Sequence, residues 1–278
     1  MKEEGLHLRV VGDYYDIGNS LLDAGWHRGS FGLHYGIWVD GIRSRAQAIT
    51  YGNEYLADLA NIQQGEFVLD AGCGLGGSAV WLARNRNAKV FGINLVSRQL
   101  KEARKISRTL RNQTEFARAD FHNLPFRDKS FDVVWSFETI EHAFSVSQFV
   151  DESQRILKPG GRLVIASLLM GEAFPSEEQQ KKINEGFIGS LNDHKTGEEV
   201  KTLMEEAGFK AIQLFDITKN ILPSACEITK MCKLGARFNW IITGLRIASP
   251  IMLKWGLAQE ELIKAGVLEY NVIVGTKS

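Results

Sequence analysis

The amino-acid sequence predicts an α/β fold in which a mostly parallel β-sheet is covered by helices on both faces. From residue 65 to residue 218, short apolar runs alternate with segments of helical periodicity, which is the pattern of repeated βα units. A glycine-rich turn follows the first apolar run. Hydrophobic residues make up 44% and charged residues 24% of the 278 positions, so the chain can bury a core of this kind without disulfides or metals.

Each element of this central region is predicted from its own pattern. Strands are read from short runs of β-branched and aromatic residues, and helices from apolar residues that recur every three to four positions. The predicted strands are residues 67–69, 90–93, 114–117, 131–135, 163–167 and 210–216, with a further strand at 270–274. The predicted helices are residues 78–85, 97–110, 148–157 and 197–207, the third of which is ended by Pro159-Gly160-Gly161.

The regions on either side of this core, which we place at residues 63–218, differ from it in composition. Residues 1–62 are rich in glycine and aromatic side chains, and we expect them to form an N-terminal helical lid. Residues 219–266 predict a helical insertion that walls a lipophilic pocket, and residues 267–278 predict the last strand of the sheet. No acidic residue lies between Glu227 and Glu260, so residues 230–257 also suggest a peripheral membrane contact. The alternative is an ordinary pair of core helices with a solvated basic face.

Charge and cysteine content narrow the possible function classes. The 33 Lys and Arg residues balance 33 Asp and Glu residues, which argues against a dedicated nucleic-acid-binding protein. Three scattered cysteines predict neither a disulfide framework nor a metal site, and they suggest a reducing compartment. We find no signal-peptide pattern at the start and no apolar run of about 18 residues. We therefore expect a cytoplasmic protein.

A glycine-rich loop, Asp70-Ala71-Gly72-Cys73-Gly74-Leu75-Gly76-Gly77, follows the first predicted strand and opens a helix. Glycines allow a backbone to approach a ligand closely, and amides at a helix N-terminus favour an anionic or polar group. Gly72, Gly74 and Gly77 match a dinucleotide-binding pattern, which would indicate an NAD-dependent oxidoreductase. That pattern requires an acidic residue about 20 positions later, where the chain has Asn94. Asp70, two positions before the first glycine, is typical of loops that bind S-adenosylmethionine. A tight turn without a ligand is the remaining alternative.

Further motifs follow the glycine loop in order. They are Ala119-Asp120, Leu124-Pro125-Phe126, Ser130-Phe131-Asp132-Val133-Val134, Glu138-Thr139-Ile140-Glu141-His142 and Leu157-Lys158-Pro159-Gly160-Gly161-Arg162-Leu163. In this order and spacing, the set resembles the class I S-adenosylmethionine-dependent methyltransferases. Asp13-Tyr14-Tyr15-Asp16 and Leu33-His34-Tyr35-Gly36-Ile37-Trp38 also resemble the subgroup that methylates sterols, tocopherols and other natural products. The resemblance implies a Rossmann-like sheet of seven strands.

The resemblance also implies which residues hold the cofactor, S-adenosylmethionine. Asp70 would accept a hydrogen bond from the ammonium group, and Asp120 would accept one from the adenine amino group. Gln99 would take the place of the missing acid at the ribose, and aromatic side chains of the lid would lie near the sulfonium. The implied cofactor contacts are Tyr15, Trp38, Asp70, Gly72, Gly74, Asn94, Leu95, Gln99, Asp120, Phe121 and Ser136.

Three candidate catalytic residues, Glu138, Glu141 and His142, follow the fourth predicted strand. Sterol methyltransferases carry a glutamate in the place of Glu138 and a histidine in the place of His142, and there an acid is thought to steady a carbocation. Sugar O-methyltransferases of the subgroup carry a histidine where Glu141 stands and an aspartate where Ser167 stands. This His–Asp pair is absent here.

The remaining histidines carry weaker expectations. His34 is a further candidate base, placed on the lid. His7, His122 and His194 show no partner pattern, and we expect them at the surface.

These observations together predict a methyltransferase that acts on a small lipophilic acceptor, such as an isoprenoid, a sterol, a tocopherol-like compound or another natural product. The absent His–Asp pair favours C-methylation, with N- or O-methylation as the alternative. Two other classes stay open at this point, the NAD-dependent oxidoreductase and a non-catalytic cofactor-binding protein on the same scaffold.

Overall fold

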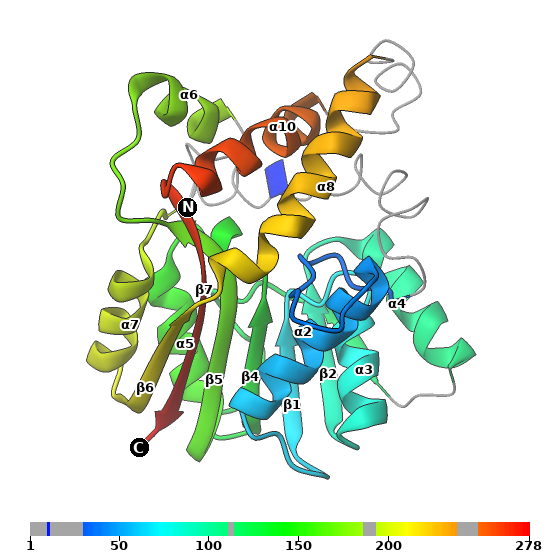
Figure 1. Cartoon of the computed structure of the whole chain (residues 1–278). Helices are drawn as coiled ribbons and strands as arrows, with labels where there is room; N and C mark the ends of the chain where they lie inside the picture. Colours follow the sequence, from blue (N-terminus) through cyan, green and yellow to red (C-terminus); the bar gives the residue numbers. More distant parts are fainter. Residues whose placement is uncertain (1–9, 12–29, 111–113, 186–192, 238–249) are drawn as a thin grey trace.

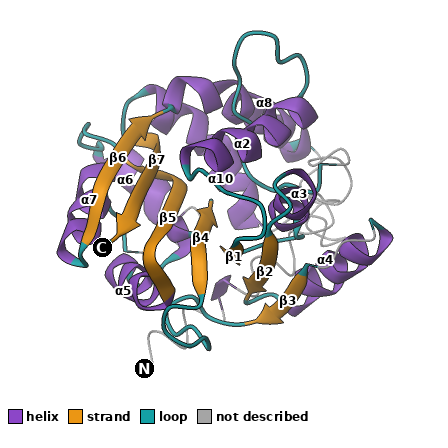
Figure 2. Cartoon of the chain, turned by 90° about the horizontal axis from the view of Figure 1, so that it is seen from below, coloured by secondary structure: helices purple, strands orange, loops and turns teal. Residues whose placement is uncertain are grey.

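The computed structural model describes residues 10–11, 30–110, 114–185, 193–237 and 250–278. The strands are β1 Phe67–Ala71, β2 Lys89–Asn94, β3 Glu115–Arg118, β4 Phe131–Phe137, β5 Leu157–Met170, β6 Phe209–Asp216 and β7 Leu268–Lys277. They form one seven-stranded sheet with the order β3-β2-β1-β4-β5-β7-β6, and Figure 2 shows this order across the sheet. β7 is antiparallel to both of its neighbours, and the other pairs are parallel. The predicted seven-stranded, mostly parallel sheet is confirmed.

Helices surround this sheet (Figure 1). They are α2 Arg45–Leu59, α3 Gly77–Asn85, α4 Ser97–Thr109, α5 Val146–Ile156, α6 Glu177–Glu185, α7 Gly197–Glu206, α8 Thr218–Ala236 and α10 Pro250–Lys264, with a 3₁₀ turn at Ile140–His142. Side-chain caps fix several of their starts, because they satisfy amides that have no partner inside the helix. Ser145 accepts from the Gln148 amide at the start of α5, and Thr196 forms a capping box with Glu199 at the start of α7.

The two faces of the sheet bury separate cores because side chains alternate along each strand. Val68 and Val133 face the helices α2 and α3, whereas their neighbours Leu69 and Val134 face α5 and α7. The central strands are buried on both faces, so they read as nearly continuous apolar runs. The largest boundary difference from the sequence expectation is at β5. β5 begins at Leu157, before the predicted start at residue 163, because Leu157 still pairs with Phe131 ahead of the Pro-Gly-Gly turn.

The predicted insertion before the last strand is confirmed, since α8 and α10 lie between β6 and β7 in the chain. Both helices lie beyond the carboxyl ends of β1, β4 and β5 (Figure 1). The loop at residues 34–38 is fastened to α8, because Trp38 Nε1 and the Gly36 amide both donate to the Ser224 hydroxyl oxygen, at 2.9 Å and 3.0 Å. In an open parallel sheet, ligands bind at this carboxyl edge, so the insertion and the loop enclose the expected position of a site.

Candidate functional site

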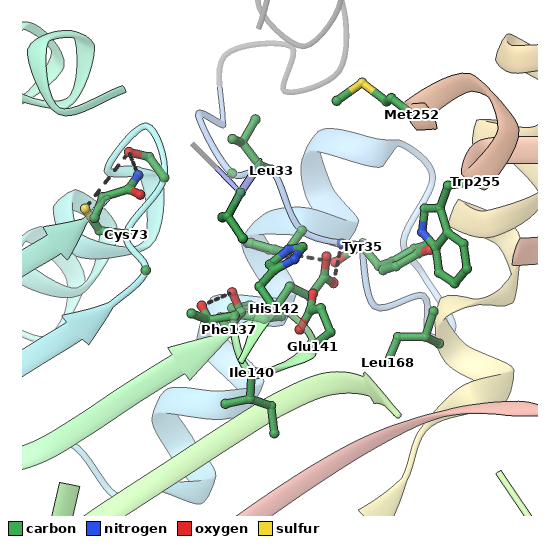
Figure 3. A pocket seen from close by; sticks show the side chains of 18 of the residues that line it. Leu33, Tyr35, Cys73, Phe137, Ile140, Glu141, His142, Leu168, Met252 and Trp255 are labelled. Atoms are coloured by element: carbon green, nitrogen blue, oxygen red, sulfur yellow. Dashed lines mark hydrogen bonds between the residues drawn. The ribbon is translucent and has the colours of Figure 1, made fainter. Parts of the chain in front are cut away.

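A cavity of about 330 Å³ lies at this edge of the sheet. One side is the glycine loop with the end of β2, and the base is the segment from Phe137 to His142. Leu33 and Tyr35 of the N-terminal loop cover it, and α8 and α10 form its far wall. Figure 3 shows Cys73 on the glycine-loop side, Met252 and Trp255 on the far side, and Glu141 and His142 between them. The cavity therefore extends from the glycine loop to the helices of the insertion.

The glycine loop requires glycine at two of its positions. Gly72 has a φ of +90°, and a Cβ there would lie 2.4 Å from the Thr139 hydroxyl. At Gly77 a Cβ would lie 2.4 Å from the carbonyl oxygen of Phe31. The second contact is made by the N-terminal loop, so the backbone of residues 31–32 packs directly on the start of α3. The two glycines thus permit the turn of the loop and also allow residues 31–32 to pack against it.

Asp70 lies at the end of β1 and lines the cavity. Its side chain is 2% exposed, and among the described residues Oδ2 has no hydrogen-bond partner. Burial raises the pKa of this carboxyl to about 7. A buried acceptor without a donor costs free energy, so the site fits a ligand that brings a cationic donor to this point. The ammonium group of S-adenosylmethionine is such a donor.

The residues predicted at the ribose and adenine lie further along the same wall. Asn94 Nδ2 donates to Gln99 Oε1 at 2.7 Å, and both side chains line the cavity together with Leu95. Phe121 also lines it and packs edge-to-face on Phe149, with ring centroids 5.2 Å apart. The structure therefore brings Asn94, Leu95, Gln99 and Phe121 together beside Gly72 and Gly74, as a cofactor site requires.

Asp120 is placed differently from its neighbours. It is not among the cavity-lining residues, although Ala119 and Phe121 on either side of it are. Its Oδ1 accepts from the His122 amide at 3.0 Å and lies 2.8 Å from His122 Nδ1. His122 is 4% exposed, so the expectation that it lies at the surface is wrong. The physical reason is that its partner, Asp120, lies only two residues away in the chain.

Three other predicted cofactor contacts lie away from the cavity or outside the described residues. Trp38 donates from its indole to Ser224 on α8 and is not among the lining residues, so its predicted cofactor contact stays a prediction. Ser136 is fully buried, is likewise not among the lining residues, and its hydroxyl has no hydrogen-bond partner within the described chain. Tyr15 lies outside the described residues.

Glu138 is held in an unusual backbone conformation at the base of the cavity. Its φ is +52°, which is strained for a residue with a side chain. Oε1 accepts two hydrogen bonds, from the Tyr35 amide at 2.7 Å and from the Tyr270 hydroxyl at 2.8 Å. The N-terminal loop and β7 thus meet at one carboxylate oxygen. Burial and the neighbouring Glu141 together raise the pKa of Glu138 well above its ordinary value.

Glu141 forms the second half of an acidic pair with Glu138. Its carboxylate accepts a hydrogen bond from the Ser167 hydroxyl on β5. Burial raises the pKa of Glu141 to about 7, while the Ser167 hydrogen bond acts in the opposite direction. Two like charges in a buried site disfavour each other, so the pair holds a proton near neutral pH. Glu141 can then accept a proton at a pH where Glu138 is still neutral.

Two histidines complete the cavity base. His142 is 6% exposed and lines the cavity beside Glu141 (Figure 3). His34 stacks on Phe137 with ring centroids 3.7 Å apart, and its Nδ1 lies 2.8 Å from the Tyr35 carbonyl oxygen. Burial lowers the pKa of His34 to about 4. His34 is therefore neutral at pH 7, with the proton on Nδ1 and a weakly basic Nε2.

The far wall of the cavity is largely apolar. Ile228, Met231, Cys232 and Gly235 recur at helical spacing along α8 and present one stripe to the cavity, opposite Met252 and Trp255 of α10. The composition of residues 219–266 predicts a pocket wall, but it does not single out these residues. The apolar periodicity of 228, 231, 232 and 235 was the available signal.

Other lining residues were not predicted and had no local signal. Asp193, His194 and Lys195 reach the cavity because the Met170 amide donates to the Lys195 carbonyl oxygen at 3.0 Å and attaches this segment to the end of β5. That contact joins positions far apart in sequence. His194 is exposed, as expected, but it also lines the cavity.

Comparison with known proteins decides between the function classes. Residues 69–165 match the family model described as "Methyltransferase domain". Methyltransferase GfsG of Streptomyces halstedii is 35% identical over 223 residues, which cover 78% of each chain. The chain belongs to the methyltransferase family. It is an S-adenosylmethionine-dependent enzyme, which removes the NAD-dependent oxidoreductase and the non-catalytic binding protein as alternatives.

Other relatives of this methyltransferase differ in the atom that their names assign to the reaction. O-methyltransferase cnsE of Penicillium expansum is 33% identical over 82% of this chain and 83% of its own. Cycloartenol-C-24-methyltransferase of Arabidopsis thaliana is 32% identical over 76% of this chain and 63% of its own. Among solved structures, the cyclopropane synthase MmaA2 of Mycobacterium tuberculosis superimposes with a TM-score of 0.84 at 14% identity, covering 98% of both chains. That likeness shows the shared fold.

Proposed function

We propose that this methyltransferase transfers a methyl group to a small, largely apolar acceptor of the isoprenoid, sterol or related natural-product type. The observation that carries the proposal is the single cavity, in which the buried acceptor oxygen of Asp70, an acidic pair and an apolar wall follow one another. The relative named cycloartenol-C-24-methyltransferase supports the sterol part of this acceptor class. A cytoplasmic location stays a prediction from the sequence.

The donor half of the cavity is proposed to hold the cofactor. Asp70 would bind the ammonium group, the backbone at Gly72 and Gly74 would lie beside the amino-acid end, and Asn94 with Gln99 would bind the ribose. Phe121 would lie beside the adenine, and Asp120 would contribute from behind the wall. When bound, the cofactor supplies an electrophilic methyl group on a sulfonium. The chain's own task is to orient the acceptor toward that methyl group and to exclude water. Such orientation can lower the activation barrier by about 7–11 kcal/mol.

The acceptor half is proposed to use the carboxyl pair Glu138 and Glu141. In C-methylation of an alkene, positive charge develops on the acceptor, and an ionised carboxyl in a dry site stabilises it. The same carboxyl can then take the proton that restores a double bond. Both carboxyls line the cavity, and Glu141 with Ser167 replaces the His–Asp pair of sugar O-methyltransferases. These features support C-methylation, with His142 placed to contact the same acceptor.

O-methylation is the second candidate. The observation that favours it is the pKa of Glu141, which burial raises to about 7, because a general base works best near the operating pH. The two candidates can be distinguished by incubating the enzyme with methyl-labelled cofactor and a panel of isoprenoids, sterols, tocopherol-like phenols and simple amines. Label on a carbon of an isoprenoid or sterol would support the proposal, and label only on oxygen would support the second candidate. Cofactor turnover restricted to the amines would overturn both.

Enlarging the side chain at Met231 should narrow the acceptor end of the cavity. Met231 lies on the cavity wall and is 37% exposed, so a tryptophan can be accommodated at the surface while part of it enters the cavity. We expect Met231→Trp to raise KM for sterol-sized acceptors by about tenfold or more and to leave the affinity for S-adenosylhomocysteine unchanged. Leu234→Trp, which adds similar bulk on the outer side of the same helix, should change neither quantity. Equal effects of the two variants would contradict this position of the acceptor.

Tyr270 is expected to lower the pKa of Glu138 in the acidic pair. Its hydroxyl donates to Glu138 and thereby lowers the pKa of that carboxyl. Removing the donor in Tyr270→Phe should raise the pKa of Glu138 further, and the acidic limb of the kcat/KM profile should move up by about one pH unit. Tyr51→Phe on α2 is the matched control. A loss of thermal stability without a change in the pH profile would show that Tyr270 serves only packing.

A further inference from the structure

The outer side of α8, together with the start of α10, carries exposed cations around exposed apolar side chains. Lys230, Lys233 and Arg237 are exposed on α8, and Lys254 is exposed on α10. Among them lie Leu234, which is 60% exposed, and Ile251, which is 38% exposed. We call these six residues the outer basic face.

The outer basic face lies opposite the cavity wall on the same helix. With about 3.6 residues per turn, the lining stripe 228, 231, 232 and 235 and the exposed stripe 230, 233, 234 and 237 point to opposite sides of α8. The helix is therefore amphipathic in an unusual sense, since one side faces an apolar cavity and the other presents cations with a protruding leucine. A solvated core helix has no reason to expose a leucine beside its cations.

The charge on this face is one-sided. No acidic residue occurs between Glu227 and Glu260 in the sequence. Glu227 and Glu185 are occupied, since Glu227 pairs with Arg45 at 2.8 Å and Glu185 pairs with Lys254, a member of this face, at 3.1 Å. Lys230, Lys233 and Arg237 form no ion pair within the described chain. The local positive charge thus stands out in a protein whose formal net charge is zero.

We propose that the outer basic face docks on an anionic lipid bilayer. Cations interspersed with exposed apolar residues on a helix are the pattern of interfacial membrane binding, in which apolar side chains enter the headgroup region and cations contact lipid phosphates. No helix among the described residues is long and apolar enough to cross a bilayer. Docking here would place the bilayer against the helix that walls the cavity, so a lipophilic acceptor could enter beside Met231. This last point rests on the proposed function, whereas the docking does not.

Sedimentation with lipid vesicles tests the proposal directly. The full-length protein should sediment with vesicles of phosphatidylcholine and phosphatidylglycerol in equal parts at about 0.1 M salt, and should be released at about 1 M salt, where charges are screened beyond about 3 Å. Vesicles of phosphatidylcholine alone should retain little protein. Absence of sedimentation with the anionic vesicles would overturn the proposal and leave the face to an acidic protein partner.

Charge-matched variants separate this face from general electrostatics. The triple variant Lys230→Gln, Lys233→Gln, Arg237→Gln should lose vesicle affinity by about fivefold per cation, on the order of a hundredfold in total. The control Lys101→Gln, Lys105→Gln, Arg108→Gln removes the same charge from exposed positions on α4 and should bind nearly as wild type. Leu234→Gln should weaken binding with the salt dependence unchanged. Equal losses in the two triple variants would overturn the assignment, and methyl transfer to a dispersed acceptor, measured without vesicles, reports on the proposed function separately.

Discussion

Glu138→Gln should lower kcat for methyl transfer by about 10²- to 10⁴-fold, the range expected when a group that moves a proton or meets charge in the transition state is lost. Glutamine keeps an oxygen that can accept from the Tyr35 amide and the Tyr270 hydroxyl, so the loop geometry should survive. The affinity for S-adenosylhomocysteine should therefore stay within about twofold, because Glu138 lies on the acceptor side. Single-turnover kinetics with a saturating acceptor would measure the effect on chemistry.

The same experiment has a second arm in the neighbouring carboxyl. Glu141→Gln removes the like charge that helps to raise the pKa of Glu138, so the pKa of Glu138 should fall and residual activity should persist to lower pH than in the wild type. If the two carboxyls act as a unit, the double variant with Glu141→Gln should be hardly slower than the worse single variant. Glu115→Gln, on exposed β3, is the control. An unchanged kcat in Glu138→Gln would remove Glu138 from the mechanism.

Asp70→Asn should weaken cofactor binding by about 10- to 150-fold, which corresponds to roughly 1.5–3 kcal/mol for a lost hydrogen bond to a charged group. The wild-type affinity should also depend on pH. Burial raises the pKa of Asp70 to about 7 in the free enzyme, and only the ionised carboxyl attracts an ammonium group. Affinity for S-adenosylhomocysteine should therefore fall as pH drops below 7, by up to about tenfold per pH unit, whereas the variant should show a flat, weak profile.

Stability distinguishes lost binding from misfolding in this variant. Because the folded pKa of Asp70 lies above its ordinary value, the ionised carboxyl costs the free protein stability as pH rises through about 7. Asp70→Asn without ligand should then melt at the same or a higher temperature than wild type above pH 7. Asp40→Asn, on an exposed turn, should match wild type in both binding and melting. A lower melting temperature for Asp70→Asn would contradict this account of its burial.

Local patterns predicted the fold, and they identified several residues that lie together on the glycine-loop side of the cavity, but they did not predict the contacts around Glu138. The glycine loop, Asn94 and Gln99 lie within one βα unit, so their proximity follows from short-range chain geometry. Glu138 and Tyr270 are 132 positions apart, and their contact depends on β7 entering the sheet between β5 and β6. No periodicity reports such a pairing.

Glu138 and Trp38 show two further features that the sequence does not predict. The positive φ of Glu138 has no sequence signal, because positions with that conformation usually carry glycine or asparagine. Trp38 was placed in the site by resemblance, yet the Ser224 hydroxyl holds its indole on α8. The motif predicted which residues lie near the site, whereas tertiary hydrogen bonds determine the orientation of their side chains.

The shared oxygen of Glu138 links the cover of the cavity to a proton. Since the Tyr35 amide stabilises the ionised form of this carboxyl, loss of that contact favours proton uptake, and by reciprocity proton uptake weakens the contact by the same free energy. Seating residues 31–38 also buries Glu138, and burial is the larger cause that raises its pKa, so a Glu138 open to water would ionise more readily than one under the seated loop. The Tyr35 amide therefore limits the cost of keeping this carboxylate charged away from water, and the proton affinity of Glu138 reports whether residues 31–38 are seated.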